Sequence, residues 1–261
     1  MKLKGRKYPY YFEGEIKPND SEIVESGVRE IVRTVKKYLK KNSGEINVLD
    51  VGSGRGDFSI QMAKVFKKVV AVEPFKDAYV YAKKNSPKQL KNIVFKHSTI
   101  EKFESKNKYD LIVALTIFEH LSNQKKAFNR MFSHLNDGGL IYITAPNKYW
   151  IFESHYGLPF LSWLPLPLAN RYLKLFRGID SYEDSSYSRS YSATKKFFDK
   201  YPCSYKFILP FDTNGAYIGY GKKGFYTVVK YLGMKLISSN SNFWTISKGF
   251  IIVVTKTGKN K

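Results

Sequence analysis

The sequence predicts an α/β fold in which a mostly parallel sheet is covered by helices on both faces. Short apolar runs of strand type alternate with segments whose apolar residues recur at helical spacing, which is typical of a parallel sheet. The first apolar run, residues 46–51, breaks abruptly into a loop with glycine at positions 52, 54 and 56. Glycine has no Cβ, so such a loop lets a ligand lie against the backbone amides.

The expected elements follow this alternation in chain order. A long helix is expected over 21–41, because its apolar residues form one stripe from Ile23 to Leu39. Apolar runs predict strands, and helical spacing predicts helices between them. The strands are expected at 46–51, 69–73, 92–97, 109–115 and 140–145, and the helices at 58–66, 77–85 and 123–135.

The alternation stops after Asn147 and returns only near the end of the chain. There, a helix is expected over 222–232 and strands over 234–238 and 249–255. The long segment between them is most simply a lid or a binding surface. The chain therefore divides into four parts: an N-terminal aromatic segment and cap helix (1–45), a cofactor-binding core (46–147), a substrate or lid insertion (148–221), and a C-terminal helix and β hairpin that complete the core (222–261).

The composition limits the classes of partner. The formal net charge of +22 fits a nucleic acid, an anionic membrane face or an anionic substrate, and it also fits a compositional bias with no partner. The lysines are scattered, which makes nucleic acid the less expected partner. No run is long enough for a membrane span and no signal peptide is recognisable, so a cytoplasmic location is expected, with peripheral membrane contact as an option.

Cysteine and histidine usage points away from disulfides and metals. A single cysteine, Cys203, excludes an internal disulfide. The four histidines show none of the short ligand spacings that zinc sites use. No metal is therefore expected.

The glycine loop has a specific spacing. A dinucleotide fingerprint would read G-x-G-x-x-G, whereas here the third glycine comes one position early, after an acid that closes the strand: Asp50-x-Gly52-x-Gly54-x-Gly56. This pattern resembles motif I of the class I S-adenosylmethionine-dependent methyltransferases. The second strand ends at Glu73, where that family keeps an acid that accepts hydrogen bonds from both ribose hydroxyls. A flavin or nicotinamide domain and a plain glycine turn are the alternatives.

The resemblance implies both a fold and a cofactor. The fold is a Rossmann-like, seven-stranded, mostly parallel sheet in the order 3-2-1-4-5-7-6, with helices on both faces and a lid insertion between strands five and six. The cofactor is S-adenosyl-L-methionine, and Thr99 stands where many members carry aspartate at the adenine. The cofactor-binding residues that it implies are Asp50, Gly52, Ser53, Gly54, Gly56, Glu73, Pro74, Thr99, Ile100 and Leu115.

The segment after the fourth strand indicates which branch of the methyltransferase family the chain resembles. Phe118-Glu119-His120-Leu121 is similar to the Glu-His-Leu segment of the ubiquinone-pathway O-methyltransferases, which implies methyl transfer to an oxygen of a small or amphipathic, lipid-like acceptor. His120 is either a general base or a structural pin for the loop. The Asn- or Asp-Pro-Pro-aromatic signature of amino-methylating families is missing. An RNA methyltransferase and a non-catalytic binding module of the same fold remain the alternatives.

The insertion carries two further candidate features. Glu153 and His155 lie two residues apart, and if the carboxylate orients the imidazole, His155 can take a proton from an acceptor hydroxyl; otherwise the two bind substrate separately. The apolar, proline-punctuated run 159–169 passes into three basic residues, Arg171, Lys174 and Arg177. That run fits a membrane-surface element, a lid over a hydrophobic substrate, or simple packing.

Overall fold

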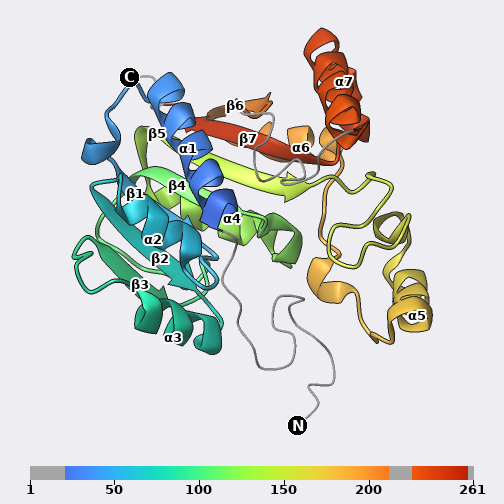
Figure 1. Ribbon diagram of the computed structural model, residues 1–261, viewed down its shortest axis with the longest axis horizontal. Helices are drawn as coiled ribbons and strands as arrows, with labels where there is room; N and C mark the ends of the chain where they lie inside the picture. Colours follow the sequence, from blue (N-terminus) through green and yellow to red (C-terminus); the bar gives the residue numbers. More distant parts are fainter. Residues whose placement is uncertain (1–20, 212–224, 258–261) are drawn as a thin grey trace.

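A computed structural model gives the arrangement of residues 21–211 and 225–257. The predicted aromatic segment Tyr8–Phe12 lies outside the described residues. The described chain forms one seven-stranded sheet with helices on both faces (Figure 1).

The strand order is β3-β2-β1-β4-β5-β7-β6, as predicted. Strands β1 to β5 run parallel, and β7 is antiparallel to both β5 and β6. The bounds are β1 Asn47–Val51, β2 Lys68–Glu73, β3 Ile93–His97, β4 Tyr109–Leu115, β5 Leu135–Pro146, β6 Cys203–Ile208 and β7 Gly249–Lys256.

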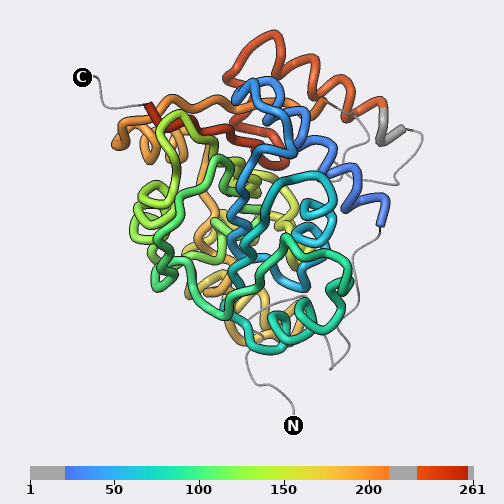
Figure 2. The backbone as a smooth tube through the Cα atoms, turned by 90° about the vertical axis from the view of Figure 1, so that its left-hand side faces the viewer, coloured from blue at the N-terminus to red at the C-terminus, as the bar shows by residue number. Residues whose placement is uncertain are grey.

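Alternate residues of the strands feed two hydrophobic cores, one on each face of the sheet. On one face Val48 of β1 packs with apolar residues of α1 and α2, and on the other Leu49 packs with those of α4 and α6. Figures 1 and 2 show β6, β7 and α7 along one edge of the molecule and β3 and α3 along the opposite edge. The helices are α1 Ser21–Tyr38, α2 Asp57–Ala63, α3 Lys76–Asn85, α4 Gln124–His134, α5 Leu166–Arg177, α6 Tyr191–Phe198 and α7 Phe225–Ser239.

The prediction of strand six at 234–238 is wrong. Those residues continue α7, because Gly233 does not break the helix, and strand six is instead Cys203–Ile208. A short apolar run fits a helix turn or a strand equally well, whereas β6 is a half-buried edge strand with alternating exposure. The described C-terminal residues 225–257 therefore contribute α7 and β7, and β7 pairs with β5 and β6. The range 148–221 contains the core strand β6 as well as the insertion.

The insertion folds around its own small core. Leu158, Leu161, Ala169, Leu173 and Tyr182 pack together and hold α5 away from the helices that cover the sheet (Figure 1). Within 21–211 and 225–257, no helix is both long enough and apolar enough to cross a membrane.

Candidate active site

The glycine loop lies between β1 and α2, at the edge of the sheet where the parallel strands have their carboxyl ends. Gly52 has φ +71°, and a Cβ there would lie 2.5 Å from Cγ2 of Ile117, so only glycine fits. Gly54 also has a positive φ, +55°, yet a Cβ built there meets no atom within 4 Å. The loop is thus closely packed at Gly52 and open at Gly54, as a ligand cradle requires.

Glu73 ties this loop to the end of β2. Its Oε2 accepts the N–H of Gly54 at 2.7 Å, and its Oε1 accepts the N–H of Phe75 at 2.8 Å. Burial raises the pKa of this carboxyl, while the two amides oppose the shift. Each carboxylate oxygen has two lone pairs, so Glu73 retains capacity to accept ligand hydroxyls.

A cavity of about 520 Å³ opens beside the loop. Nine of the ten predicted cofactor residues line it. Phe75, Ile117 and Leu121, which are not among those ten, line it as well. Gly56 does not line the cavity; a Cβ there would lie 2.8 Å from Cβ of Ala82, so this glycine shapes the loop from behind. An open glycine, a buried acid and apolar walls suit an adenosyl group with an amino acid end, and the residues present fit S-adenosylmethionine.

Asp50 supports the loop from below. Its side chain is buried, and Oδ2 accepts the hydroxyl of Ser59 at the start of α2. Burial raises the pKa of Asp50 to about 7, the Ser59 hydrogen bond opposes the shift, and the charge of Glu73 adds to it. Asp50 therefore joins β1 to α2 as well as lining the cavity.

The raised pKa of Asp50 predicts a pH dependence of stability. In the unfolded chain an aspartate ionises near pH 3.9, whereas the folded protein keeps its proton up to about pH 7. Unfolding then releases a proton, so the free energy of unfolding falls as pH rises through this window. We expect the melting temperature of Asp50→Asn, measured by differential scanning calorimetry between pH 5 and 7.5, to fall less than that of the unmodified protein. If the melting temperatures of the two proteins fell equally with pH, Asp50 would not be the source of this pH dependence.

A second cavity, of about 490 Å³, adjoins the first. Thr116 lines both cavities, and its φ of +50° is unusual for a β-branched residue. The walls of the second cavity are mostly apolar and come from β7, α7 and the segment that joins them, including Trp244, Phe250 and Ile237. Its polar residues include Glu119, Ser154 and His155.

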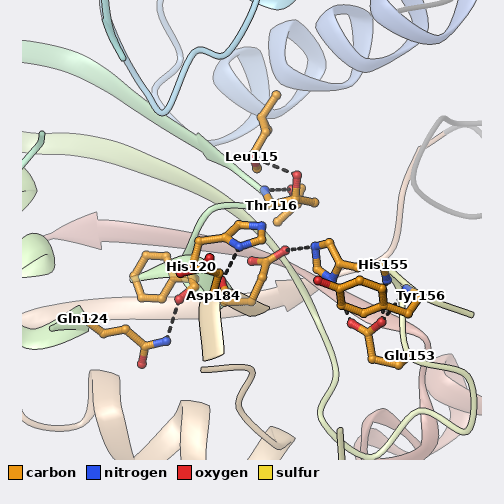
Figure 3. A network of polar contacts seen from close by, with 11 residues as sticks. Leu115, Thr116, His120, Gln124, Glu153, His155, Tyr156 and Asp184 are labelled. Atoms are coloured by element: carbon orange, nitrogen blue, oxygen red, sulfur yellow. Dashed lines mark hydrogen bonds and ion pairs between the residues drawn. The ribbon is translucent and has the colours of Figure 1, made fainter. Parts of the chain in front are cut away.

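Figure 3 shows a cluster of polar side chains. Members of this cluster line both cavities, His155 the second and His120 the first. His155 Nδ1 donates to Oε1 of Glu153 at 2.8 Å, and Oε2 of Glu153 accepts the N–H groups of His155 and Tyr156, each at 2.7 Å. His120 Nδ1 donates to the carbonyl of Asp184 at 2.6 Å. The His120 and His155 rings meet edge to face, with centroids 4.9 Å apart.

Glu119 completes the cluster. Its side chain is 1% exposed, and its Oε1 lies 3.9 Å from Nε2 of His155. Its Oε2 has no hydrogen-bond partner among the residues that the structure describes. Gln124 fixes the turn that carries Glu119 and His120 by donating to the carbonyls of Phe118 at 2.6 Å and Tyr187 at 2.8 Å.

The environment shifts the three titrating groups of the cluster in different directions. Burial raises the pKa of Glu119 to about 7 against the opposing charge of His155. Burial, followed by the His155 charge, lowers the pKa of His120 to about 4. Burial alone would lower the pKa of His155, but the hydrogen bond and charge of Glu153 outweigh it and raise that pKa.

The structure thus brings the three predicted catalytic residues, His120, Glu153 and His155, into one cluster, and adds Glu119. The sequence places Glu119 in the Glu-His-Leu segment but gives it no catalytic role, because nothing local shows that its side chain is buried. The fold also brings together histidines that are distant in the sequence. Glu119, His120 and His155 each offer a ligand atom, and these atoms lie within 4.8 Å of one another.

Comparison with known proteins identifies the family of the chain. A family model described as a methyltransferase domain matches residues 23–187. Among curated proteins, the ubiquinone biosynthesis O-methyltransferase of Rickettsia akari (strain Hartford) is 25% identical over 59% of this chain and 62% of its own length. The protein of the same name from Rickettsia prowazekii (strain Madrid E) is 28% identical over 56% and 60%. The match thus spans about three fifths of these relatives.

Solved structures show the same fold. The plantazolicin methyltransferase BpumL, solved with a monoazolic desmethylPZN analogue and SAH, covers 91% of this chain and 84% of its own at 16% identity, with a TM-score of 0.57. The YcgJ protein from Bacillus subtilis covers 88% and 99% at 15% identity, with a TM-score of 0.55. Since the family model matches more than half of the chain, this protein belongs to the methyltransferase domain family of class I, whose cofactor is S-adenosylmethionine.

Proposed function

We propose that this protein transfers the methyl group of S-adenosylmethionine to an oxygen of a small or amphipathic acceptor. The observation that carries the proposal is the meeting of two cavities at Thr116 and the turn after it. Glu119 faces the apolar cavity, and the adjacent His120 faces the cofactor cavity. An acceptor in one cavity and a cofactor in the other therefore touch at this junction, and positioning of this kind lowers the barrier strongly.

The cofactor end of the proposal assigns three roles. The amides of the glycine loop hold the amino acid end, Glu73 accepts the ribose hydroxyls, and Thr99 with Ile100 flanks the adenine. The open side of Gly54 and the unused lone pairs of Glu73 support the first two roles. When bound, the cofactor supplies a methyl group on a sulfonium, which is electrophilic without further activation.

The acceptor end favours an amphipathic molecule with a hydroxyl. Apolar side chains of α7 and β7 would bury its hydrocarbon part, and the polar groups at the junction would receive the hydroxyl. The name of the curated relatives, O-methyltransferases, supports oxygen as the accepting atom.

The polar cluster supports the transfer step. Glu153 holds the His155 ring through Nδ1, so Nε2 points toward Glu119 and the acceptor cavity. His155 can then take the hydroxyl proton as the acceptor oxygen bonds to the methyl carbon and the carbon–sulfur bond breaks. His120 lies on the cofactor side, held by the Asp184 carbonyl, and would fix the reacting groups in place.

Transfer of radiolabelled methyl tests the proposal. The purified protein is offered a hydroxylated aromatic head group alone, the same head group with an alkyl tail, the tailed compound with its hydroxyl already methylated, and RNA. We expect label in the tailed hydroxyl compound above all. Label in RNA alone would replace the small-molecule assignment, and no label in any acceptor, together with no cofactor binding, would favour the non-catalytic module.

We also propose that the outer face of α5 rests on an anionic bilayer from which such an acceptor is drawn. Leu175 is 78% exposed and Phe176 55%, and Leu168 is exposed on the same helix. The basic residues Arg171 and Lys174 stand beside them and complement anionic head groups. The exposed Trp163, just before α5, extends this apolar surface.

Vesicle flotation checks the contact. We expect the protein to float with vesicles that contain phosphatidylglycerol, and the double variant Leu175→Glu, Phe176→Glu to stay in the unbound fraction, because two acids replace the inserting side chains. Val80→Glu on α3 is the matched control, since Val80 is also a half-exposed apolar residue but lies on a helix outside the insertion. Equal flotation of all three proteins would contradict the α5 surface.

A further inference from the structure

We propose that Glu119, His120 and His155 form a binding site for a divalent transition-metal ion. This inference deepens the proposed function, because the ion would lie at the junction where the acceptor oxygen is expected. The site is built by two imidazoles and one carboxylate, a ligand set that suits zinc, iron(II), manganese and cobalt.

The two histidines present the same nitrogen to the site. A carbonyl oxygen only accepts hydrogen bonds, so His120 donates from Nδ1 to Asp184 and its lone pair lies on Nε2. His155 donates from Nδ1 to the carboxylate of Glu153, which again leaves the lone pair on Nε2. In metal sites, ligating histidines are held by such bonds from the ring nitrogen that does not bind the metal. Glu153 and the Asp184 carbonyl supply these bonds.

The carboxylate ligand is buried and incompletely satisfied. Glu119 is 1% exposed, and its Oε2 has no hydrogen-bond partner among the described residues. Burying a carboxylate in this way is costly unless a cation or a donor meets it. A divalent ion bound to Glu119 removes that cost.

The three candidate ligand atoms lie only slightly too far apart to bind one ion. The three ligand atoms lie within 4.8 Å of one another, and Oε1 of Glu119 lies 3.9 Å from Nε2 of His155. Ligand atoms around a tetrahedral zinc ion are about 3.3 Å apart, given metal–ligand bonds near 2.0–2.1 Å. Glu119 and His120 lie in the turn after β4, and His155 lies in the insertion. Small rotations of these side chains would bring the three ligand atoms within bonding distance of one ion.

The position of the site gives the ion a role. Three protein ligands leave at least one coordination position open, and Glu119 and His155 line the acceptor cavity while His120 lines the cofactor cavity. An acceptor hydroxyl bound at the open position would lose its proton to solvent more easily, because a metal ion lowers the pKa of a bound hydroxyl. The resulting oxygen anion then bonds to the methyl carbon as the carbon–sulfur bond breaks. With the ion bound, His155 acts as a metal ligand and not as the base, and the reaction needs no side-chain base.

Titration of the chelator-treated protein with Co²⁺ and Zn²⁺ tests the site. We expect one ion per chain by calorimetry and visible absorption bands from bound Co²⁺. Glu119→Gln and His155→Gln should each weaken binding by about 100-fold or more. Glu104→Gln is the matched control, because its exposed carboxylate contacts only Arg130 among the described residues. It should bind like the unmodified protein.

Cofactor binding by the same four proteins distinguishes a failure of the metal site from a failure of the proposed function. Binding of S-adenosylhomocysteine, measured without metal, should be equal in all four proteins and shows that each variant is folded. No Co²⁺ or Zn²⁺ binding in a protein that binds S-adenosylhomocysteine would overturn the metal site and leave the methyltransferase assignment standing. Metal binding of equal strength in the Glu119 and His155 variants would show adventitious binding elsewhere and would overturn it too.

Discussion

Gly54→Asp should strongly weaken the binding of S-adenosylhomocysteine. The new side chain would enter the open space that the glycine loop leaves for the ligand, and it would bring a second carboxylate beside Glu73, which already accepts the Gly54 N–H at 2.7 Å. We expect the dissociation constant to rise by at least about 100-fold, which corresponds to about 2.7 kcal/mol. Isothermal titration calorimetry measures it directly.

The control for this variant is Gly138→Asp. Gly138 has φ +73°, and a Cβ built there also meets no atom within 4 Å, but it lies near the start of β5, where the pairing with β4 is irregular, outside both cavities. Both variants place aspartate at a positive φ and should lose similar, small amounts of stability. Normal binding by Gly54→Asp, or equal loss of binding in the two variants, would refute the role given to the loop.

Glu153→Ala should strongly lower the rate of methyl transfer. The side chain accepts three hydrogen bonds, from two backbone amides and from Nδ1 of His155, and it is 5% exposed. Its removal frees the imidazole to turn away from the junction. Groups that hold such a side chain in place are typically worth about 10- to 100-fold in activity, so we expect a fall in kcat of about that size.

Cofactor binding separates this effect from unfolding. Glu153 does not line the cofactor cavity, so Glu153→Ala should bind S-adenosylhomocysteine normally. Glu153→Gln, which can still accept from Nδ1 of His155, should recover part of the activity. If Glu153→Gln were as inactive as Glu153→Ala, orientation of His155 would not be the role of this residue.

The cofactor half of the site could be predicted from the sequence because its signals are local. A glycine loop directly after an apolar strand and an acid at the end of the next strand fall next to each other in any parallel sheet of this order. The exception is Gly56, which turned out to pack against Ala82 and Phe95 instead of lining the cavity. Spacing identifies a glycine loop but does not tell which glycine faces the ligand.

The acceptor half depends on contacts between distant segments. Strand six was misplaced because the run 234–238 is short and apolar, and only its packing shows that it continues α7. The walls of the apolar cavity combine α7, β7 and the end of β6, which no local pattern links. The same holds for the polar cluster: Glu153 and His155 were recognisable as a pair, but their contact with Glu119 and His120 arises from the folded insertion.

Calorimetric titration of the unmodified protein with S-adenosylhomocysteine decides whether the cavity beside the glycine loop holds the cofactor. The cavity beside Gly54 and Glu73 predicts one site per chain with affinity in the micromolar range, and the bound ligand should raise the melting temperature. An absence of both heat and thermal shift would contradict the claim that this cavity holds the cofactor.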